Sequence, residues 1–141
     1  MNASEIITFC RDSFRPMMDR YGFNWQEGDE VDLKGNSYAW GQYVNGDRKL
    51  RFAFGPQICL VRIHLKELDI SIGQYFKALS YTTQFFDQFE ADEQKAIVML
   101  KGEFESLGRE FLEGSVAEIK RTLINLRKRS QNVHAKEPPL R

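Results

Sequence analysis

Five residues in three adjacent segments of the sequence have side chains suited to binding an anion: Tyr43, Lys49, Arg51, Arg62 and His64. If these segments are neighbouring strands, residues at alternate positions share a face, and the five form a basic, partly aromatic stripe. A stripe of this kind binds an anion, an RNA or an acidic protein surface, although a solvated face has a similar composition. The stripe lacks the stacked aromatic residues of RNA-binding sheets, so the predicted partner is another protein and nucleic acid is disfavoured.

A second basic cluster, Arg127, Lys128 and Arg129, lies near the end of the last predicted helix. It would contact an anionic partner, or it would complement the helix dipole. Charge is segregated around it: residues 83–114 have eight acids and three bases, a net charge of −5, and residues 115–141 have seven bases and two acids, a net charge of +5. Helices of opposite sign would pair within one chain or between two copies, so we predict a homodimer through the C-terminal helices as one assembly.

Residues typical of catalytic or metal centres are not clustered in the sequence. The two histidines, His64 and His134, lie on a predicted strand and near the C-terminus, and no paired-cysteine motif accompanies them. Cys59 and His64 lie on one strand with opposite parity, which puts them on opposite faces and excludes a nucleophile–base pair along a regular strand. We therefore predict no catalytic residue, no metal and no cofactor.

Two groups of carboxylates have a less specific pattern. Four acids lie between Glu27 and Asp32, but they lack the alternate-position ligands, central glycine and distal glutamate of a calcium loop. We interpret this segment as a solvated acidic loop or an edge strand. A second group is interpreted as a solvated helix face: Glu103, Glu105, Glu110 and Glu113. The rival hypothesis is a small hydrolase or transferase whose acids come from different segments, and a deep pocket that holds two carboxylates in unequal environments would favour it.

The elements that position these residues are indicated by a change of hydrophobic rhythm near Asp69. Apolar residues alternate from Ser37 to Leu65 and then recur every three or four positions from Ile72 to Leu126. Strands followed by helices indicate an α+β fold. We predict strands at 37–44, 48–54 and 58–65 and a fourth, short strand around 31–33. An N-terminal helix precedes them, capped by Ser4, ended by Gly22, and kinked or split near Pro16.

The Asn45-Gly46 hairpin decides which side chains share a face of the sheet. A two-residue turn at Asn45-Gly46 pairs Trp40 with Arg51 and separates Tyr38 and Trp40 from the apolar residues of the next strand. A three-residue loop, residues 44–46, instead pairs Trp40 with Leu50. It places five large side chains on one face: Tyr38, Trp40, Leu50, Phe52 and Phe54. Burial of each large apolar side chain contributes about 1.5–3 kcal/mol, which favours the longer loop.

The helical half is predicted to contain three helices packed mainly on one face of the sheet. Ser71 and Gln74 form a capping box for a helix that runs to about Phe89. Asp92 caps a second helix that extends to Phe111, and a capping box at Ser115 begins a third after Gly114. We predict one domain over residues 1–130 and a flexible tail over residues 131–141.

Composition is that of an ordinary globular protein: 141 residues, 42% hydrophobic, 28% charged and a formal net charge of zero. The N-terminus lacks a basic region followed by an apolar run, and no apolar stretch approaches the ~20 residues of a membrane span. Cys10 and Cys59 are predicted to be buried free thiols. These features favour a cytoplasmic protein without a membrane partner.

Three features together resemble small uncharacterised bacterial cytoplasmic α+β proteins: Tyr21-Gly22-Phe23 after the first helix, Tyr43-Val44-Asn45-Gly46 at the hairpin, and strands ahead of a helical second half. Some of these look like immunity proteins, which neutralise a cognate toxin by binding it. The resemblance implies a non-catalytic protein-interaction module and assigns no residue a role. The alternatives are the hydrolase or transferase and RNA or anion binding through the basic stripe.

Overall fold

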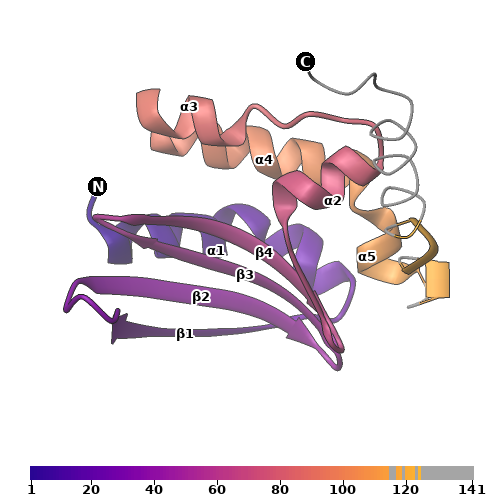
Figure 1. The fold of residues 1–141 in the computed structure, drawn as a ribbon, viewed down its shortest axis with the longest axis horizontal. Coiled ribbons are helices and arrows are strands. Elements are labelled where there is room, and N and C mark those ends of the chain that lie inside the picture. Colours follow the sequence, from indigo (N-terminus) through magenta and orange to yellow (C-terminus); the bar gives the residue numbers. More distant parts are fainter. Residues whose placement is uncertain (115–116, 119, 123, 125–141) are drawn as a thin grey trace, which may run out of the picture.

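The computed structural model describes residues 1–114, 117–118, 120–122 and 124 of the chain, which has the predicted α+β fold (Figure 1). Helix α1 (Ala3–Arg20) comes first. Five strands follow: β1 (Asn24–Val31), β2 (Ser37–Asn45), β3 (Arg48–Gly55), β4 (Ile58–Leu65) and β5 (Leu68–Ser71). Four helices come next: α2 (Ile72–Ala78), α3 (Phe85–Ala91), α4 (Glu93–Leu107) and α5 (Arg109–Glu113). The described residues beyond Gly114 are also helical.

The strands form one antiparallel sheet in the order β1-β2-β3-β4-β5, so each strand pairs with the next along the chain. Three or four strands were predicted. The acidic segment from Glu27 is part of β1, which confirms the edge-strand interpretation. The fifth strand, β5, was not predicted because the turn before it has Lys66 at φ 54°, a left-handed conformation for which glycine is the usual sequence signal.

The helices cover one face of this sheet in two layers (Figure 1). Helix α1 packs across β2 and β3, and α2 packs on β4 and β5. Helix α4 lies against α1, and α3 packs on α4. The core fills both interfaces, because Phe14 of α1 contacts the Phe52 ring of β3 at 5.1 Å and the Phe104 ring of α4 at 6.2 Å.

The N-cap of helix α1 is Asn2, two residues before the predicted cap, Ser4. The Asn2 side chain accepts a hydrogen bond from the Glu5 N–H (2.8 Å), and the Glu5 carboxylate accepts one from the Asn2 N–H (3.5 Å). This capping box replaces the predicted Ser4 cap, because Asn2 has extended backbone and an acidic residue at the third helical position. Gly22 (φ 80°) ends the helix as predicted, and the Phe23 N–H donates to the Met18 carbonyl in a Schellman motif.

Helix α1 continues through Pro16, so of the two predicted outcomes the split is wrong and the kink stays a prediction. Proline removes one main-chain hydrogen bond and crowds the preceding turn. The apolar stripe of α1 is buried on both sides of Pro16, at Phe14 and at Met17 and Met18. This burial offsets the local cost of the proline.

Two helices predicted as continuous are each divided. Helix α2 ends near Ser80, which adopts φ 62° while the Tyr81 N–H donates to the Phe76 carbonyl. A serine in the glycine position of a Schellman motif gives no clear sequence signal. The second break is at Gly108, between α4 and α5. The capping box of Ser71 and the Asp92 cap are confirmed, whereas the predicted cap at Ser115 and the tail 131–141 lie outside the described residues.

Candidate functional site

The β2–β3 hairpin has neither of the predicted registers. Asn45 pairs with Arg48 around a two-residue loop, Gly46-Asp47, in which Gly46 has φ 58°. Glycine at the first loop position suits a type II′ turn. Trp40 therefore pairs with Ala53 and Tyr43 with Leu50. Compared with the predicted two-residue turn, the strand pairing is shifted by two residues, so the same side chains share a face as in that alternative. The favoured three-residue loop, which puts Trp40 on the face of Leu50, is wrong.

Small residues of β2 explain why Trp40 points away from the helices. Ala39 and Gly41 lie on the face that α1 covers, and both are buried or tightly contacted. A Cβ on Gly41 would lie 2.2 Å from the Trp25 ring and 3.1 Å from Ile7 of α1. This face needs room for helix α1 and for Trp25 rather than for Tyr38 and Trp40, so the three-residue loop predicted from side-chain burial is wrong.

On the face opposite the helices, Glu30 and Tyr38 form one pair, and three longer rows run across the strands. One row is Gly28, Trp40, Ala53 and Leu60, and the next is Gln26, Gln42, Arg51, Arg62 and Ser71. The third is Asn24, Val44, Lys49, His64 and Asp69. Among the described elements, no helix lies over these rows (Figure 1). We call this surface the open face and define it by Tyr38, Trp40, Val44, Lys49, Arg51, Leu60, Arg62 and His64.

Four of the five predicted stripe residues meet on the open face. Arg51 is directly opposite Arg62, and Lys49 is directly opposite His64. Tyr43 is not among them, so its predicted place is wrong. Its side chain is 1% exposed in the core, and its hydroxyl donates to the Arg11 carbonyl. Burial raises the pKa of Tyr43 to about 12. The register caused this error, because the favoured loop gave Tyr43 the wrong parity.

Asp69 of β5 neutralises one side of the open face. Its carboxylate accepts a hydrogen bond from Arg62 Nε (2.6 Å) and lies 3.5 Å from His64 Nε2. Burial lowers the pKa of His64, and Arg51, Lys49 and Arg62 lower it further, while Asp69 opposes them. His64 is therefore mostly neutral at pH 7.

Arg51, by contrast, has no ion pair with a described carboxylate. Its guanidinium carbon lies 5.4 Å from the centre of the Trp40 ring, a cation–π distance. Lys49 on the same strand also has no carboxylate partner among the described residues. The positive charge of the open face is thus concentrated on β3, beside Trp40.

Two aromatic residues of the open face were assigned to the core by the sequence analysis. Three indole atoms of Trp40 lie 3.0 Å from where a Gly28 Cβ would be, so the ring covers that glycine. The Tyr38 hydroxyl donates to Glu30 (2.8 Å). The sequence did contain a signal, because Ala39 and Gly41 alternate with Tyr38 and Trp40, and two small residues on one strand face mark the close approach of a helix.

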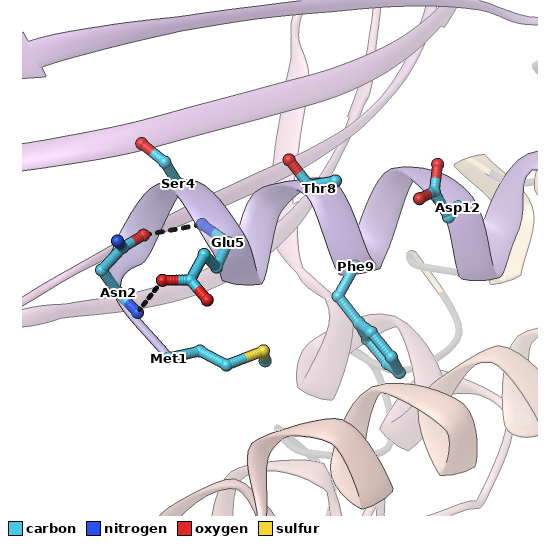
Figure 2. A pocket seen from close by; sticks show the side chains of 7 residues that line it. All are labelled: Met1, Asn2, Ser4, Glu5, Thr8, Phe9 and Asp12. Carbon is cyan, nitrogen blue, oxygen red and sulfur yellow. Dashed lines mark hydrogen bonds between the residues drawn. The ribbon is translucent and has the colours of Figure 1, made fainter.

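A hollow of about 380 Å³ lies along the first turns of α1 (Figure 2). Its two carboxylates belong to Glu5, which closes the capping box, and to Asp12, which lies 3.0 Å from Arg11 Nε. Figure 2 shows Ser4 and Thr8 on the opposite side of the helix from Phe9. The lining comes from one short segment, residues 1–12. This hollow does not bring together carboxylates of separate elements, as the hydrolase or transferase hypothesis requires.

The remaining predicted groups have simpler outcomes. Cys10 is buried and Cys59 is exposed, so the predicted burial is right for the first and wrong for the second, and both are free thiols. Within the described residues, no group of three or more His, Cys, Asp or Glu side chains is placed to hold a metal ion. No described helix is both long and apolar enough to cross a bilayer.

The C-terminal basic patch, Arg127, Lys128 and Arg129, lies outside the described residues. Nearer the core, Lys120 Nζ pairs with Glu67 Oε1 at 2.9 Å, between β4 and β5. The Thr122 hydroxyl donates to the Glu110 carboxylate of α5 at 3.0 Å. These contacts join the start of the basic segment to the sheet and to the acidic half of the same chain, and the homodimer stays a prediction.

The likeness to immunity proteins was based on the end of α1 and on the β2–β3 hairpin. Both are local turns in which a glycine has positive φ, Gly22 at 80° and Gly46 at 58°. Turns of this kind occur in many folds, so the likeness stays a prediction. Comparison with protein-family models, curated proteins and solved structures found no match.

Proposed function

We propose that this protein is a binding module that recognises an acidic surface of another protein through its open face. The observation that carries the proposal is Arg51, a half-buried cation without a described carboxylate partner that lies against Trp40 in the middle strands of the sheet. Arginine and tryptophan are the residue types most enriched among the anchors of protein interfaces.

The surroundings of Arg51 define the chemistry of the partner. Trp40 and Leu60 lie together in the row next to Arg51, and Lys49 lies two residues before Arg51 on β3. A partner that fits has carboxylates opposite Arg51 and Lys49 and an apolar contact for Trp40 and Leu60. Arg62 and His64 already share Asp69, so they form the rim of this surface.

A toxin-neutralising role is the finer form of the proposal. An immunity protein acts by covering a cognate toxin, which needs a broad, rigid surface and no chemistry of its own. The open face belongs to a five-stranded sheet whose other face packs on the helical core.

The test is affinity capture from the native host with the tagged full-length protein, its Arg51→Glu variant and a control. Lys95→Glu is the control, because Lys95 is exposed on α4 in the helical layer and the charge change is the same. We expect one stoichiometric protein partner, bound equally by the wild type and by Lys95→Glu. Arg51→Glu should weaken binding by about 2 kcal/mol, or roughly thirtyfold. If Arg51→Glu still captures the partner at the wild-type level, the open face is not the binding surface.

We expect the fold to tolerate Arg51→Glu, so that the variant is a fair probe of binding. Arg51 is directly opposite Arg62, and like charges opposite each other on a sheet are destabilising. Glutamate at this position would face Arg62 with opposite charge. Loss of binding would therefore report on the surface rather than on unfolding, and a thermal melt of the variant checks this.

Single-stranded RNA is the second candidate, favoured by one observation. The observed register brings Tyr38 and Trp40 onto the face that bears Lys49 and Arg51, and aromatic residues beside cations are what unpaired bases stack on. The same three proteins are titrated with fluorescent oligouridylate at two salt concentrations. Affinity that falls steeply with salt and is lost in Arg51→Glu would move the proposal to RNA. Absence of binding would leave the protein partner.

A further inference from the structure

Strand β1 leaves one whole edge of the sheet open. It is the first strand in the order and pairs with β2 along all eight of its residues. In the described part of the chain, nothing pairs with its outer side (Figure 1). An edge strand presents a row of main-chain donors and acceptors that another extended chain can pair with. Six of the eight residues of β1 are exposed.

A trough runs beside this edge, between β1 and α1. A cavity of about 130 Å³ lies there, lined by Ser4 and Thr8 of α1 and by Glu27 and Asp29 of β1. It adjoins a second hollow of about 370 Å³, which shares Ser4 and Asp29 with it. Figure 2 shows Ser4 and Thr8 projecting from one side of α1. An added strand would direct every second side chain toward this trough, because side chains alternate along a strand.

The charge of the edge selects the partner. Residues 24–32 contain four acids, Glu27, Asp29, Glu30 and Asp32, and no base. Glu27 is 3.6 Å from Arg11 of α1, whereas Asp29 has no ion pair or hydrogen bond with a described side chain. Glu30 accepts a hydrogen bond from the Tyr38 hydroxyl on the opposite face. On the trough side of β1, where alternate side chains of an added strand would point, the carboxylate without an ion pair is therefore Asp29.

We propose that β1 docks an extended basic segment of another protein, which adds a sixth strand and directs lysine or arginine side chains toward Asp29 and Glu27. Main-chain hydrogen bonds fix the geometry of the contact, and cross-strand pairs of opposite charge determine which segments bind. This edge is distinct from the open face, so its partner and that of the proposed function bind independently.

A second copy of the chain fits this edge poorly. An antiparallel pairing of two β1 strands centred on Gly28 would set Glu27 of one copy opposite Asp29 of the other. Like charges directly opposite each other are unfavourable in a sheet. A basic strand has the complementary charge at both positions.

The experiment measures binding of a labelled synthetic peptide, acetyl-Thr-Lys-Val-Lys-Val-Lys-Thr-amide, to the full-length protein by fluorescence anisotropy. Asp29→Lys should weaken binding about tenfold, because it turns a cross-strand attraction into a repulsion. The matched control is Glu90→Lys, which makes the same charge change at an exposed position of α3 and should bind like the wild type. The same peptide with glutamate in place of lysine should not bind. Equal loss in both variants would overturn the proposal.

N-methylated peptides separate strand addition from simple charge attraction. In an antiparallel ladder only alternate residues direct their N–H toward the neighbouring strand. Methylation of the lysine amides and methylation of the valine amides should therefore affect binding differently. One should abolish binding, and the other should leave it unchanged. Equal binding of both methylated peptides would show attraction by charge alone and overturn the proposal. A wild-type dimer in sedimentation that Asp29→Lys strengthens, because lysine would then face Glu27 of the other copy, would assign the edge to a second copy and overturn the proposal.

Discussion

At the scale of single residues, glycines and aromatic rings determine how closely the layers of this protein approach. Gly41 lies beneath the Trp25 ring, and Gly28 lies beneath the Trp40 ring on the opposite face. Each tryptophan covers a strand position that has no side chain of its own. The two pairs differ in what a methyl group would meet, since the Gly41 contacts are tighter than those of Gly28.

Gly41→Ala should destabilise the protein. Its Cβ would lie 2.2 Å from the Trp25 ring, so the ring must move, and overpacking of this kind costs about 1–3 kcal/mol. The free energy of unfolding in urea measures the effect. Gly102→Ala is the control, because nothing lies within 4 Å of its Cβ position on α4. Alanine in a helix should stabilise by about 0.5–1 kcal/mol there. A Gly41→Ala protein as stable as the wild type would contradict the packing described for Trp25.

At the scale of elements, helix ends were the features most open to sequence reasoning. Asp92 and the capping box of Ser71 were predicted and confirmed, because polar caps act through local hydrogen bonds that a sequence window contains. The missed boundaries have a common cause. Lys66 and Ser80 have positive φ, and their side chains give no sign of a conformation that glycine usually adopts.

The start of α1 offers a direct comparison between the cap expected from sequence and the cap observed. Asn2→Ala removes the acceptor of the Glu5 N–H and should cost about 1 kcal/mol in unfolding free energy. Ser4→Ala should change stability by less than about 0.5 kcal/mol, because Ser4 lies inside the helix. Urea unfolding of the two variants measures the difference. A larger loss of unfolding free energy for Ser4→Ala than for Asn2→Ala would show that Ser4 is the cap.

At the scale of the whole molecule, folding stability is linked to protonation of His64. Burial lowers the pKa of His64 in the folded state below its ordinary value of about 6.5. The unfolded chain therefore binds the proton more tightly, so stability is full above pH 6.5 and falls as the pH drops below it. Urea midpoints measured between pH 8 and pH 5 should show this fall in the wild type and a smaller one in His64→Gln. Parallel profiles in the two proteins would contradict the linkage.

The fold class was predictable because strand and helix periods are properties of local sequence. The alternation from Ser37 and the three- to four-residue spacing from Ile72 both correspond to observed elements. The open face was predicted in part. Its four basic residues share a face in every register that pairs odd-numbered residues of β3 with even-numbered residues of β4: Lys49, Arg51, Arg62 and His64. Trp40 and Tyr43 were each predicted on the wrong face of the sheet. The face of each depends on where α1 packs, and the sequence of β2 alone does not contain that information.

The layer order also has a consequence for synthesis on the ribosome. A nascent chain that has emerged as far as Ser71 already contains α1 and each of the strands that the structure describes. Helix α1 contacts the sheet through Phe14 and Phe52, but the other side of Phe14 meets Phe104, which is made more than thirty residues later. Until α4 has been translated, the outward side of α1 is bare apolar surface, and transiently exposed surface of this kind recruits chaperones. The half-made protein thus exposes an apolar surface that the finished one buries.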